Sequence, residues 1–247
     1  MKETKKILNA RYELLREIGR GGFSNVFYAY DKKLKKYWAI KKIQKVRDHP
    51  LSKDLLKEVE ILKDLHHPML PNIVDIIEKK EAWYVVMDYI LGTTLEEYQK
   101  TNQGIETDIL LSWGKELADV MDYLHQCNPP IIHQDLKPSN IMIKPRGSLM
   151  LLDFGIAMRL GMEKPVSLGT KGYAAPEQYG NRGRYLVDER TDIYGLGKTL
   201  EIFLKVHQNK RSKKDKELKK IMDRCTKEDP KERYQNCMEL RDHFDYA

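Results

Sequence analysis

Two short runs near the N-terminus combine residue types that could bind phosphate groups. The run Ile18-Gly19-Arg20-Gly21-Gly22-Phe23-Ser24-Asn25-Val26 lies between two strand-like segments, so its glycines would let backbone N–H groups approach phosphates in a hairpin. Fifteen residues after Val26, Lys41 lies on the next strand-like segment, and Glu58 on a predicted helix could pair with its ammonium group. Each signal alone also fits a simpler interpretation, because glycine hairpins and solvated strand lysines are common.

The segments that must position these residues are mostly strand-like up to about residue 89. Short runs rich in β-branched and aromatic residues predict strands at Tyr12–Leu15, Val26–Tyr30, Tyr37–Ile40, Ile73–Ile77 and Trp83–Met87. Apolar residues at spacings of three and four predict one helix over Asp54–Leu65, which His67-Pro68 ends. The first part of the chain is therefore predicted to be a small β-sheet with one helix.

After Gly92 the pattern becomes helical. An apolar stripe predicts a long helix over Ile109–Leu124, with Thr107 as its N-cap. Further helices are predicted at about 191–207, 214–226 and 236–245, and short extended segments at Ile131–Ile132, Ile141–Ile143 and Met150–Leu152. The pattern predicts a small β-rich lobe joined to a larger, mainly helical lobe.

Three further motifs follow in order along this helical part. They are His133-Gln134-Asp135-Leu136-Lys137-Pro138-Ser139-Asn140, Asp153-Phe154-Gly155 and Ala175-Pro176-Glu177. Together with the glycine run, Lys41 and Glu58, they resemble the signature of the eukaryotic-like (Hanks-type) serine/threonine protein kinase family, most of all its bacterial members. The resemblance covers about residues 12–245. It implies an α+β, bilobal protein kinase fold in a single domain. The N-lobe, about residues 1–87, would be a small antiparallel β-sheet lobe, followed by a hinge at 88–92 and a larger, mainly α-helical C-lobe of about residues 93–247.

The resemblance also implies an activity, ATP- and Mg²⁺-dependent transfer of a phosphoryl group to Ser or Thr hydroxyls of proteins, and a role for each motif residue. Asp135 would accept or orient the substrate hydroxyl, and Lys137 would neutralise charge on the γ-phosphoryl group. Asn140 and Asp153 would bind Mg²⁺, which favours oxygen ligands. The implied nucleotide-binding residues are Ile18, Gly19, Gly21, Gly22, Ser24, Val26, Ala39, Lys41, Glu58, Met87, Asp88 and Ile90.

The same resemblance assigns structural roles to residues around the motifs. Asp192 would brace the loop that carries Asp135, and Arg233 would pair with Glu177. Phe154, His133 and Leu62 would stack between the lobes. These residues would hold the site together without taking part in the chemistry.

One departure from the family pattern concerns regulation. Gln134 stands where many kinases have an arginine that grips a phosphorylated activation loop, and Val166 stands four residues before Thr170, at the usual phosphoacceptor position. Without the arginine, a phosphate on the adjacent Ser167 would lose the charge-assisted hydrogen bonds that order such loops. The chain is therefore predicted to be a non-RD kinase whose activity does not depend on activation-loop phosphorylation.

The distribution of charged residues limits the kinds of partner that the sequence predicts. The 44 Lys and Arg residues exceed the 37 Asp and Glu residues, but the excess is concentrated between residues 205 and 220, which argues against nucleic-acid binding. Lys210, Arg211, Lys213 and Lys214 are predicted either to form a solvated face or to dock an acidic partner.

The predicted location follows from apolar runs and cysteines. No apolar run approaches the length of a membrane span. With three widely spaced cysteines, the chain is predicted to be cytoplasmic, or the cytoplasmic domain of a longer membrane-anchored kinase.

Two alternative functions remain open from the sequence. A pseudokinase that serves as a scaffold should have lost one of the four central residues, and all four are present: Lys41, Asp135, Asn140 and Asp153. A small-molecule phosphotransferase would share the catalytic and metal aspartates, but it would lack the Gly169-Thr170 and Ala175-Pro176-Glu177 segments. Both observations favour a protein kinase.

Overall fold

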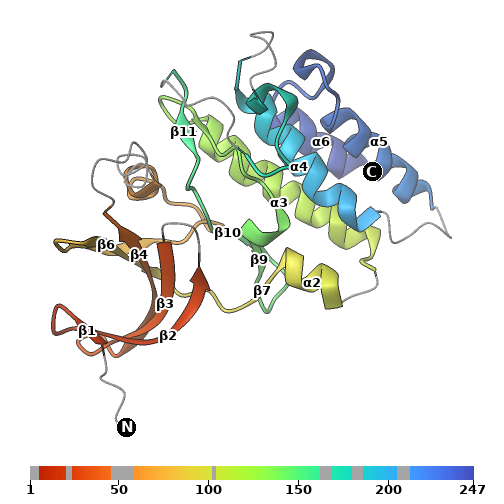
Figure 1. The fold of residues 1–247 in the computed structure, drawn as a ribbon. Helices are drawn as coiled ribbons and strands as arrows, with labels where there is room; N and C mark the ends of the chain where they lie inside the picture. The colour runs from red at the N-terminus through yellow and green to blue at the C-terminus, as the bar shows by residue number, and fades with distance from the viewer. Residues whose placement is uncertain are drawn as a thin grey trace. The chain divides into compact units, whose positions relative to one another are not determined.

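The structure is a computed structural model that describes residues 6–20, 24–45, 58–101, 104–161, 169–179, 186–204 and 212–247. The chain divides into two compact units, Met1–Leu91 and Gly92–Ala247. The first unit contains a curled antiparallel sheet, and the second is mainly helical (Figure 1). The predicted α+β fold class is confirmed.

The first unit is built on a six-stranded antiparallel sheet with the order β1-β2-β3-β4-β6-β5. Its strands are β1 (Lys6–Leu8), β2 (Tyr12–Arg20), β3 (Ser24–Asp31), β4 (Lys36–Gln44), β5 (Ile73–Glu78) and β6 (Ala82–Asp88). All five predicted strands are confirmed, and β1 was not predicted. It pairs with β2 through a tight turn in which Asn9 and Ala10 adopt positive φ. Residues 58–62 are helical, and the rest of the predicted helix before them lies outside the described residues.

The two faces of this sheet bury different side chains. Register pairs Val26 with Lys41 and Tyr28 with Ala39, so alternation along β3 and β4 puts these four residues on one face. That face carries the apolar cluster Ala39, Ile43, Val59, Val85 and Met87. The opposite face carries a larger cluster, made of Leu8, Tyr12, Leu14, Ala29, Ile40, Ile77, Ala82, Tyr84 and Val86.

Polar contacts hold the curl of the sheet near its first turn. Arg11 donates from Nε and Nη2 to the fully buried Asp31 at 3.0 and 2.7 Å. These hydrogen bonds lower the pKa of Asp31 to about 2. The Tyr12 hydroxyl donates to Asp75 on β5 at 2.9 Å, which ties the start of β2 to the far edge of the sheet.

The second unit consists of five described helices, one three-stranded and one two-stranded sheet of short strands, and single 3-10 turns. The helices are α2 (Leu95–Thr101), α3 (Thr107–His125), α4 (Glu189–Leu204), α5 (Lys213–Cys225) and α6 (Cys237–Tyr246). The strands are β7 (Thr93–Thr94), β8 (Ile131–Ile132), β9 (Ile141–Ile143), β10 (Leu149–Leu151) and β11 (Met158–Arg159). The 3-10 turns are η1 (Pro138–Asn140), η2 (Pro176–Tyr179) and η4 (Pro230–Glu232).

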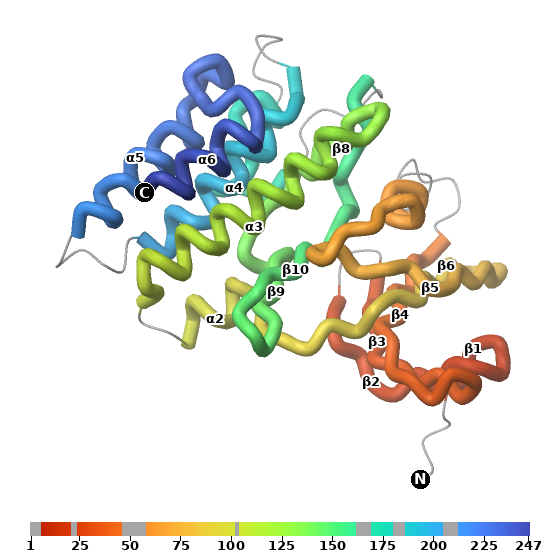
Figure 2. Tube along the Cα trace, turned by 180° about the vertical axis from the view of Figure 1, so that it is seen from behind, coloured from red at the N-terminus to blue at the C-terminus, as the bar shows by residue number. Residues whose placement is uncertain are grey.

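Helix α3 is the centre of the second unit. Its apolar stripe is buried, and it packs against α4 and α6, while α5 packs against α4 (Figure 2). The contacts are close where glycines lie: a Cβ at Gly114 would come within 2.5 Å of the Phe244 ring on α6, and one at Gly197 within 2.5 Å of Cys225 Cβ. These helices form the rigid base on which the site residues are mounted.

The helices predicted in the second unit are confirmed within the described residues, except at one cap. The N-cap of α3 is Glu106, and Thr107 is the first helical residue. The Thr107 hydroxyl is hydrogen-bonded to Asp215 on α5 and does not cap the backbone. The prediction of Thr107 as N-cap is therefore wrong, because a long-range partner takes the hydroxyl. Within the described parts of the chain, every helix is too short or too polar to cross a bilayer.

Candidate active site

A small antiparallel hairpin brings together Asn140 and Asp153, which are thirteen residues apart. Strands β9 and β10 pair with Leu151 opposite Ile141, and the Leu152 N–H donates to the Asn140 carbonyl at 2.9 Å. Asn140 therefore lies at the start of one strand, and Asp153 follows directly from the end of its partner. The Asp153 carboxylate accepts from the Gly155 N–H at 3.2 Å, which orients one of its oxygens.

The side chains of Asp135, Lys137 and Thr170 form one hydrogen-bonded group. Thr170 Oγ1 donates to Asp135 Oδ1 at 2.7 Å, and Lys137 Nζ donates to Thr170 Oγ1 at 2.8 Å and to Asp135 Oδ2 at 2.6 Å. Asn140 Nδ2 donates to both the carbonyl and the Oδ2 of Asp135, at 3.0 and 3.1 Å. A partly buried carboxylate thus accepts a hydrogen bond from a hydroxyl while an ammonium group lies beside both. This is the geometry in which a carboxylate can act as a general base toward an alcohol.

The loop that carries Asp135 (residues 133–140, the catalytic loop) is braced from α4. Asp192 accepts from the backbone N–H groups of His133 and Gln134 at 2.8 and 2.7 Å, and His125 Nε2 lies 2.9 Å from its Oδ2. Burial alone would raise the pKa of Asp192, but the contact with His125 and the other hydrogen bonds lower it below its ordinary value. Burial lowers the pKa of His133, whose ring packs edge-on against Phe154 at 4.9 Å. The predicted bracing by Asp192 and the ring contact between His133 and Phe154 are confirmed, and the place of Leu62 in the predicted stack stays a prediction.

Gln134 connects the catalytic loop to the segment that begins at Asp153. Its side chain is 4% exposed, and its Nε2 donates to the Ile156 carbonyl at 2.8 Å. Its backbone has a φ of 66°, in the left-handed region that residues other than glycine seldom adopt. Gln178, which is also buried, donates from Nε2 to the Gln134 carbonyl at 2.9 Å and accepts from the Ala175 N–H at 2.8 Å.

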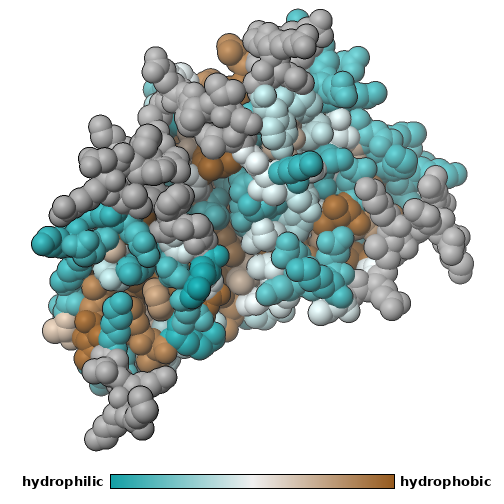
Figure 3. All heavy atoms as spheres, in the orientation of Figure 1, coloured by the Kyte–Doolittle hydropathy of each residue, from teal (hydrophilic) through white to brown (hydrophobic). Residues whose placement is uncertain are grey.

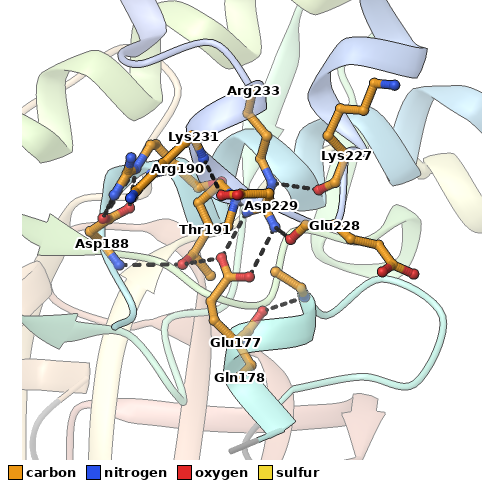
Figure 4. A network of polar contacts seen from close by, with 12 residues as sticks. Glu177, Gln178, Asp188, Arg190, Thr191, Lys227, Glu228, Asp229, Lys231 and Arg233 are labelled. Carbon is orange, nitrogen blue, oxygen red and sulfur yellow. Dashed lines mark hydrogen bonds and ion pairs between the residues drawn. The ribbon is translucent and has the colours of Figure 1, made fainter. Parts of the chain in front are cut away.

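The end of this segment is anchored by a fully buried ion pair (Figure 4). Arg233 donates to both carboxylate oxygens of Glu177, at 2.7 and 2.9 Å, and neither side chain is exposed. The remaining guanidinium hydrogens reach the carbonyls of Arg190, Glu228 and Lys227. The Thr191 hydroxyl donates to Glu177 Oε1 at 2.9 Å. The predicted pairing of Arg233 with Glu177 is confirmed.

The residues predicted to bind nucleotide lie in the first unit. Lys41 Nζ lies 2.6 and 2.7 Å from the two carboxylate oxygens of Glu58, so the predicted pair forms. Gly19 is paired with Val26, on the sheet face that also carries Lys41 and Ala39. Gly21 and Gly22 lie outside the described residues.

The strand that leads to the predicted hinge carries the other nucleotide-binding candidates. Met87 on β6 pairs with Ala39 on β4 and is buried in the same apolar cluster. The Asp88 carboxylate accepts from the Asn72 backbone and side chain at 3.0 and 2.7 Å, which fixes the end of β6. Ile90 follows two residues later, Ile18 is partly exposed, and Ser24 is half-buried at the start of β3.

The donor set fits Mg²⁺ in part. Asn140 and Asp153 supply an amide oxygen and a carboxylate, which are hard oxygen ligands, and Mg²⁺ commonly takes one or two protein ligands together with phosphate oxygens. The described residues contain no cluster of three or more His, Cys, Asp or Glu side chains that would form a complete metal cage. The residues thus suit a metal that arrives with a phosphate ligand.

Two residues of this site were not predicted. Gln178 follows the Ala175-Pro176-Glu177 motif and has no distinctive sequence pattern, and His125 ends an amphipathic helix like many other histidines. Their roles depend on contacts with Gln134 and Asp192, which are 44 and 67 residues away along the chain. No local signal could have identified either residue.

Comparison with known proteins finds a family match and several relatives. The protein kinase domain family matches residues 12–208. The serine/threonine-protein kinase PrkC of Bacillus subtilis is 34% identical over 198 residues, which are 78% of this chain and 30% of that protein. The probable serine/threonine-protein kinase PknB of Lactococcus lactis is 32% identical over 199 residues, 78% of this chain and 31% of that protein. The serine/threonine-protein kinase cds1 of Schizosaccharomyces pombe is 31% identical over 208 residues, 79% of this chain and 45% of that protein. The chain thus spans less than half the length of these curated relatives.

Proposed function

The chain belongs to the protein kinase domain family, and from this premise we propose that it transfers the γ-phosphoryl group of ATP to serine and threonine hydroxyls of protein substrates. The observation that carries the proposal is the group formed by Asp135, Lys137 and Thr170. There a carboxylate accepts a hydroxyl hydrogen bond at 2.7 Å with an ammonium beside it. The names of the relatives, all serine/threonine kinases, support the same class of substrate.

Asp135 and two side chains that contact it, Lys137 and Asn140, have distinct tasks in the proposal. Asp135 orients the substrate hydroxyl and takes its proton as the oxygen attacks phosphorus. Lys137 lies 2.6 Å from Asp135 and stabilises negative charge on the transferred group. Asn140 holds the Asp135 carboxylate and backbone in place through its amide nitrogen.

Nucleotide binding is proposed for the sheet face of the first unit. Val26 and Ala39 would contact the adenine base, and Lys41, held by Glu58, would bind the α- and β-phosphates. Asn140 and Asp153 would hold Mg²⁺, which when bound neutralises charge on the phosphate oxygens. The short contacts of Lys41 with both Glu58 oxygens support this assignment, because they fix a flexible ammonium group in one position.

The test of this proposal compares Asp135→Asn with the wild-type chain. Loss of a positioned general base typically lowers the rate by about 10²- to 10⁴-fold. Turnover with radiolabelled ATP should fall by that order while ATP binding changes little. Asp153→Asn should weaken Mg²⁺-dependent ATP binding as well. Equal turnover of the wild type and Asp135→Asn would refute the assignment, and transfer to small-molecule acceptors in place of proteins would favour the alternative phosphotransferase.

We also propose that activity does not depend on phosphorylation of the activation segment (residues 153–177). The neutral Gln134 donates to the Ile156 carbonyl, so this contact creates no cluster of positive charge that needs a phosphate. Ser167 and Val166 lie outside the described residues. Phosphatase-treated protein, checked by mass spectrometry, and Ser167→Ala should both keep the initial rate of the untreated enzyme. A tenfold drop in either would contradict the proposal.

A docking role for the basic run is a third proposal. Lys213 and Lys214 begin α5, whose surface is largely hydrophilic in Figure 3, and Lys214 pairs with Asp108 at 2.5 Å. Lys210 and Arg211 lie outside the described residues. An acidic protein partner would be attracted by these four charges, and the attraction would weaken with salt.

We also propose a cytoplasmic location. The free state of the described cysteines supports it, since reducing compartments keep thiols unpaired.

The docking proposal is tested by exchanging Lys210, Arg211, Lys213 and Lys214 for Gln. Phosphorylation of the physiological target should weaken mainly at low salt, while a short generic peptide should be phosphorylated as before. The matched control is the exchange of Lys219 and Lys220 on the same helix, which pair with Asp223 and Glu217. An equal loss on both substrates, or an equal effect of the control, would rule out docking.

A further inference from the structure

Two buried glutamines join the catalytic loop to both described ends of the activation segment. Gln134 Nε2 donates to the Ile156 carbonyl near the start of the segment. Gln178 Nε2 donates to the Gln134 carbonyl, and Gln178 Oε1 accepts from the Ala175 N–H near the end of the segment. We call these three hydrogen bonds the glutamine bridge. Two of them meet at Gln134, directly before Asp135 in the catalytic loop, and the third ties Gln178 to Ala175.

Neighbouring residues hold the backbone of Gln134 and the side-chain amide of Gln178 tightly in place. Gln134 has a φ of 66°, and such a conformation persists when surrounding contacts hold it. Here Asp192 holds its N–H and Gln178 holds its carbonyl. A Cβ on Gly169 would come within 2.9 Å of Gln178 Nε2, so the amide lies directly against the residue before Thr170.

We infer that Gln134 and Gln178 are positioning residues, which set the distance between Asp135 and Thr170 and replace a charged phosphate contact by neutral hydrogen bonds. This inference rests on the proposed kinase function. Gln134 and Gln178 are both about 95% buried. Burying an unpaired charge at these positions would cost much free energy, whereas burying hydrogen-bonded amides would not. Because Thr170 Oγ1 is 2.7 Å from Asp135 Oδ1, a small displacement of residues 169–175 would disturb the reacting group directly.

The first test removes the hydrogen bonds while keeping the side-chain volume. Gln178→Met and Gln134→Met should each lower kcat/KM for a protein substrate by about tenfold or more, with ATP affinity near wild type. Both should also lower the melting temperature, because they leave buried backbone groups without a partner. Gln235→Met is the matched control, because Gln235 donates to the carbonyls of Pro230, Lys231 and Arg233 outside the catalytic loop. It should affect stability and leave kcat/KM unchanged. Activity within about twofold of wild type in Gln178→Met would overturn the inference.

The second test uses protonation as an internal comparison within one variant. The carboxyl introduced by Gln178→Glu can accept from Ala175, but it can donate to the Gln134 carbonyl only when protonated. Burial raises the pKa of such a carboxyl, so activity relative to wild type should increase several-fold from about pH 8 to about pH 6. The titratable groups of the neighbouring segments are Asp135, Lys137, Tyr173, Glu177, Asp192 and Arg233, and the ratio to wild type cancels their own titration. A flat ratio would mean that the donated hydrogen bond has no positioning role.

Hydrogen exchange separates failure of the bridge from failure of the proposed function. Amides in residues 169–179 should exchange faster in Gln178→Met than in the wild type, while those of α3 and α6 should be unchanged. This readout does not need activity, so an inactive wild type would refute the kinase proposal and leave the bridge to be judged by exchange. Unchanged exchange in residues 169–179 would overturn the bridge itself.

Discussion

The buried pair of Glu177 and Arg233 allows a quantitative prediction about stability. Both side chains are fully buried, so removing one partner leaves an uncompensated charge in the interior. Breaking such a pair typically costs about 3–5 kcal/mol. In Glu177→Gln, the guanidinium keeps the carbonyls of Arg190, Glu228 and Lys227, so the cost should lie near the lower value. In Arg233→Met, the carboxylate keeps the Thr191 hydroxyl as a partner and three carbonyls lose their donor, so the cost should lie near the upper value.

Thermal and urea denaturation of the full chain measure these costs. For a protein of this size, about 3–5 kcal/mol corresponds to a loss of roughly 6–20 °C in melting temperature. The double variant Glu177→Gln/Arg233→Met removes both charges, so its cost should be clearly smaller than the sum of the two single costs. Lys219→Met, which breaks the exposed pair with Asp223, should cost no more than about 1 kcal/mol. Additive costs, or an Arg233→Met cost below about 1 kcal/mol, would refute the reasoning.

Three further predictions concern single contacts. The lowered pKa of Asp31 means that its ion pair with Arg11 contributes about 2 kcal/mol to the free energy of unfolding above pH 4. This contribution is lost as the pH falls toward about 2. Urea titrations should therefore show the difference in stability between wild type and Asp31→Asn closing over that range. Gly114→Ala should cost about 1–3 kcal/mol, because its Cβ would overlap Phe244, and Phe244→Leu in the same chain should recover part of the loss in a thermal melt. Ser212→Ala should lower stability by about 1 kcal/mol and speed amide exchange in the first turn of α5, because the hydroxyl caps the Asp215 N–H. Unchanged exchange in that turn would show that the cap contributes nothing.

Local patterns predicted the elements that carry the candidate site. The β-branched runs and the apolar stripe depend on neighbouring residues, and they located the strands of the first unit and helix α3. The ordered motifs predicted that Glu177 meets Arg233 across 56 residues, which no periodicity would have indicated. This pairing was implied by the family resemblance, and the structure bears it out.

The missed features depend on partners that are distant in the sequence. Thr107 has the residue type of an N-cap, but Asp215 takes its hydroxyl, so Glu106 occupies the cap position. Strand β1 lies in a charged segment without alternation, and it forms because Leu8 joins the core cluster. Gln178 would be interpreted as an ordinary polar residue, and its two contacts become visible when the catalytic loop is placed beside it.

The residues that the family model matches and the residues that pack into the two units have different limits. This difference matters when the protein is divided into fragments. The match spans residues 12–208, whereas Leu8 completes the core of the sheet and Arg11 is the ion-pair partner of Asp31. Beyond residue 208, α5 and α6 cover α4 and α3, and Arg233 neutralises Glu177. A recombinant fragment cut at the edges of the match would therefore expose apolar side chains at both ends and leave two buried carboxylates without their cations. Boundaries for expression, domain exchange or limited proteolysis should follow these contacts, and the smallest autonomous piece should begin before Leu8 and extend through α6.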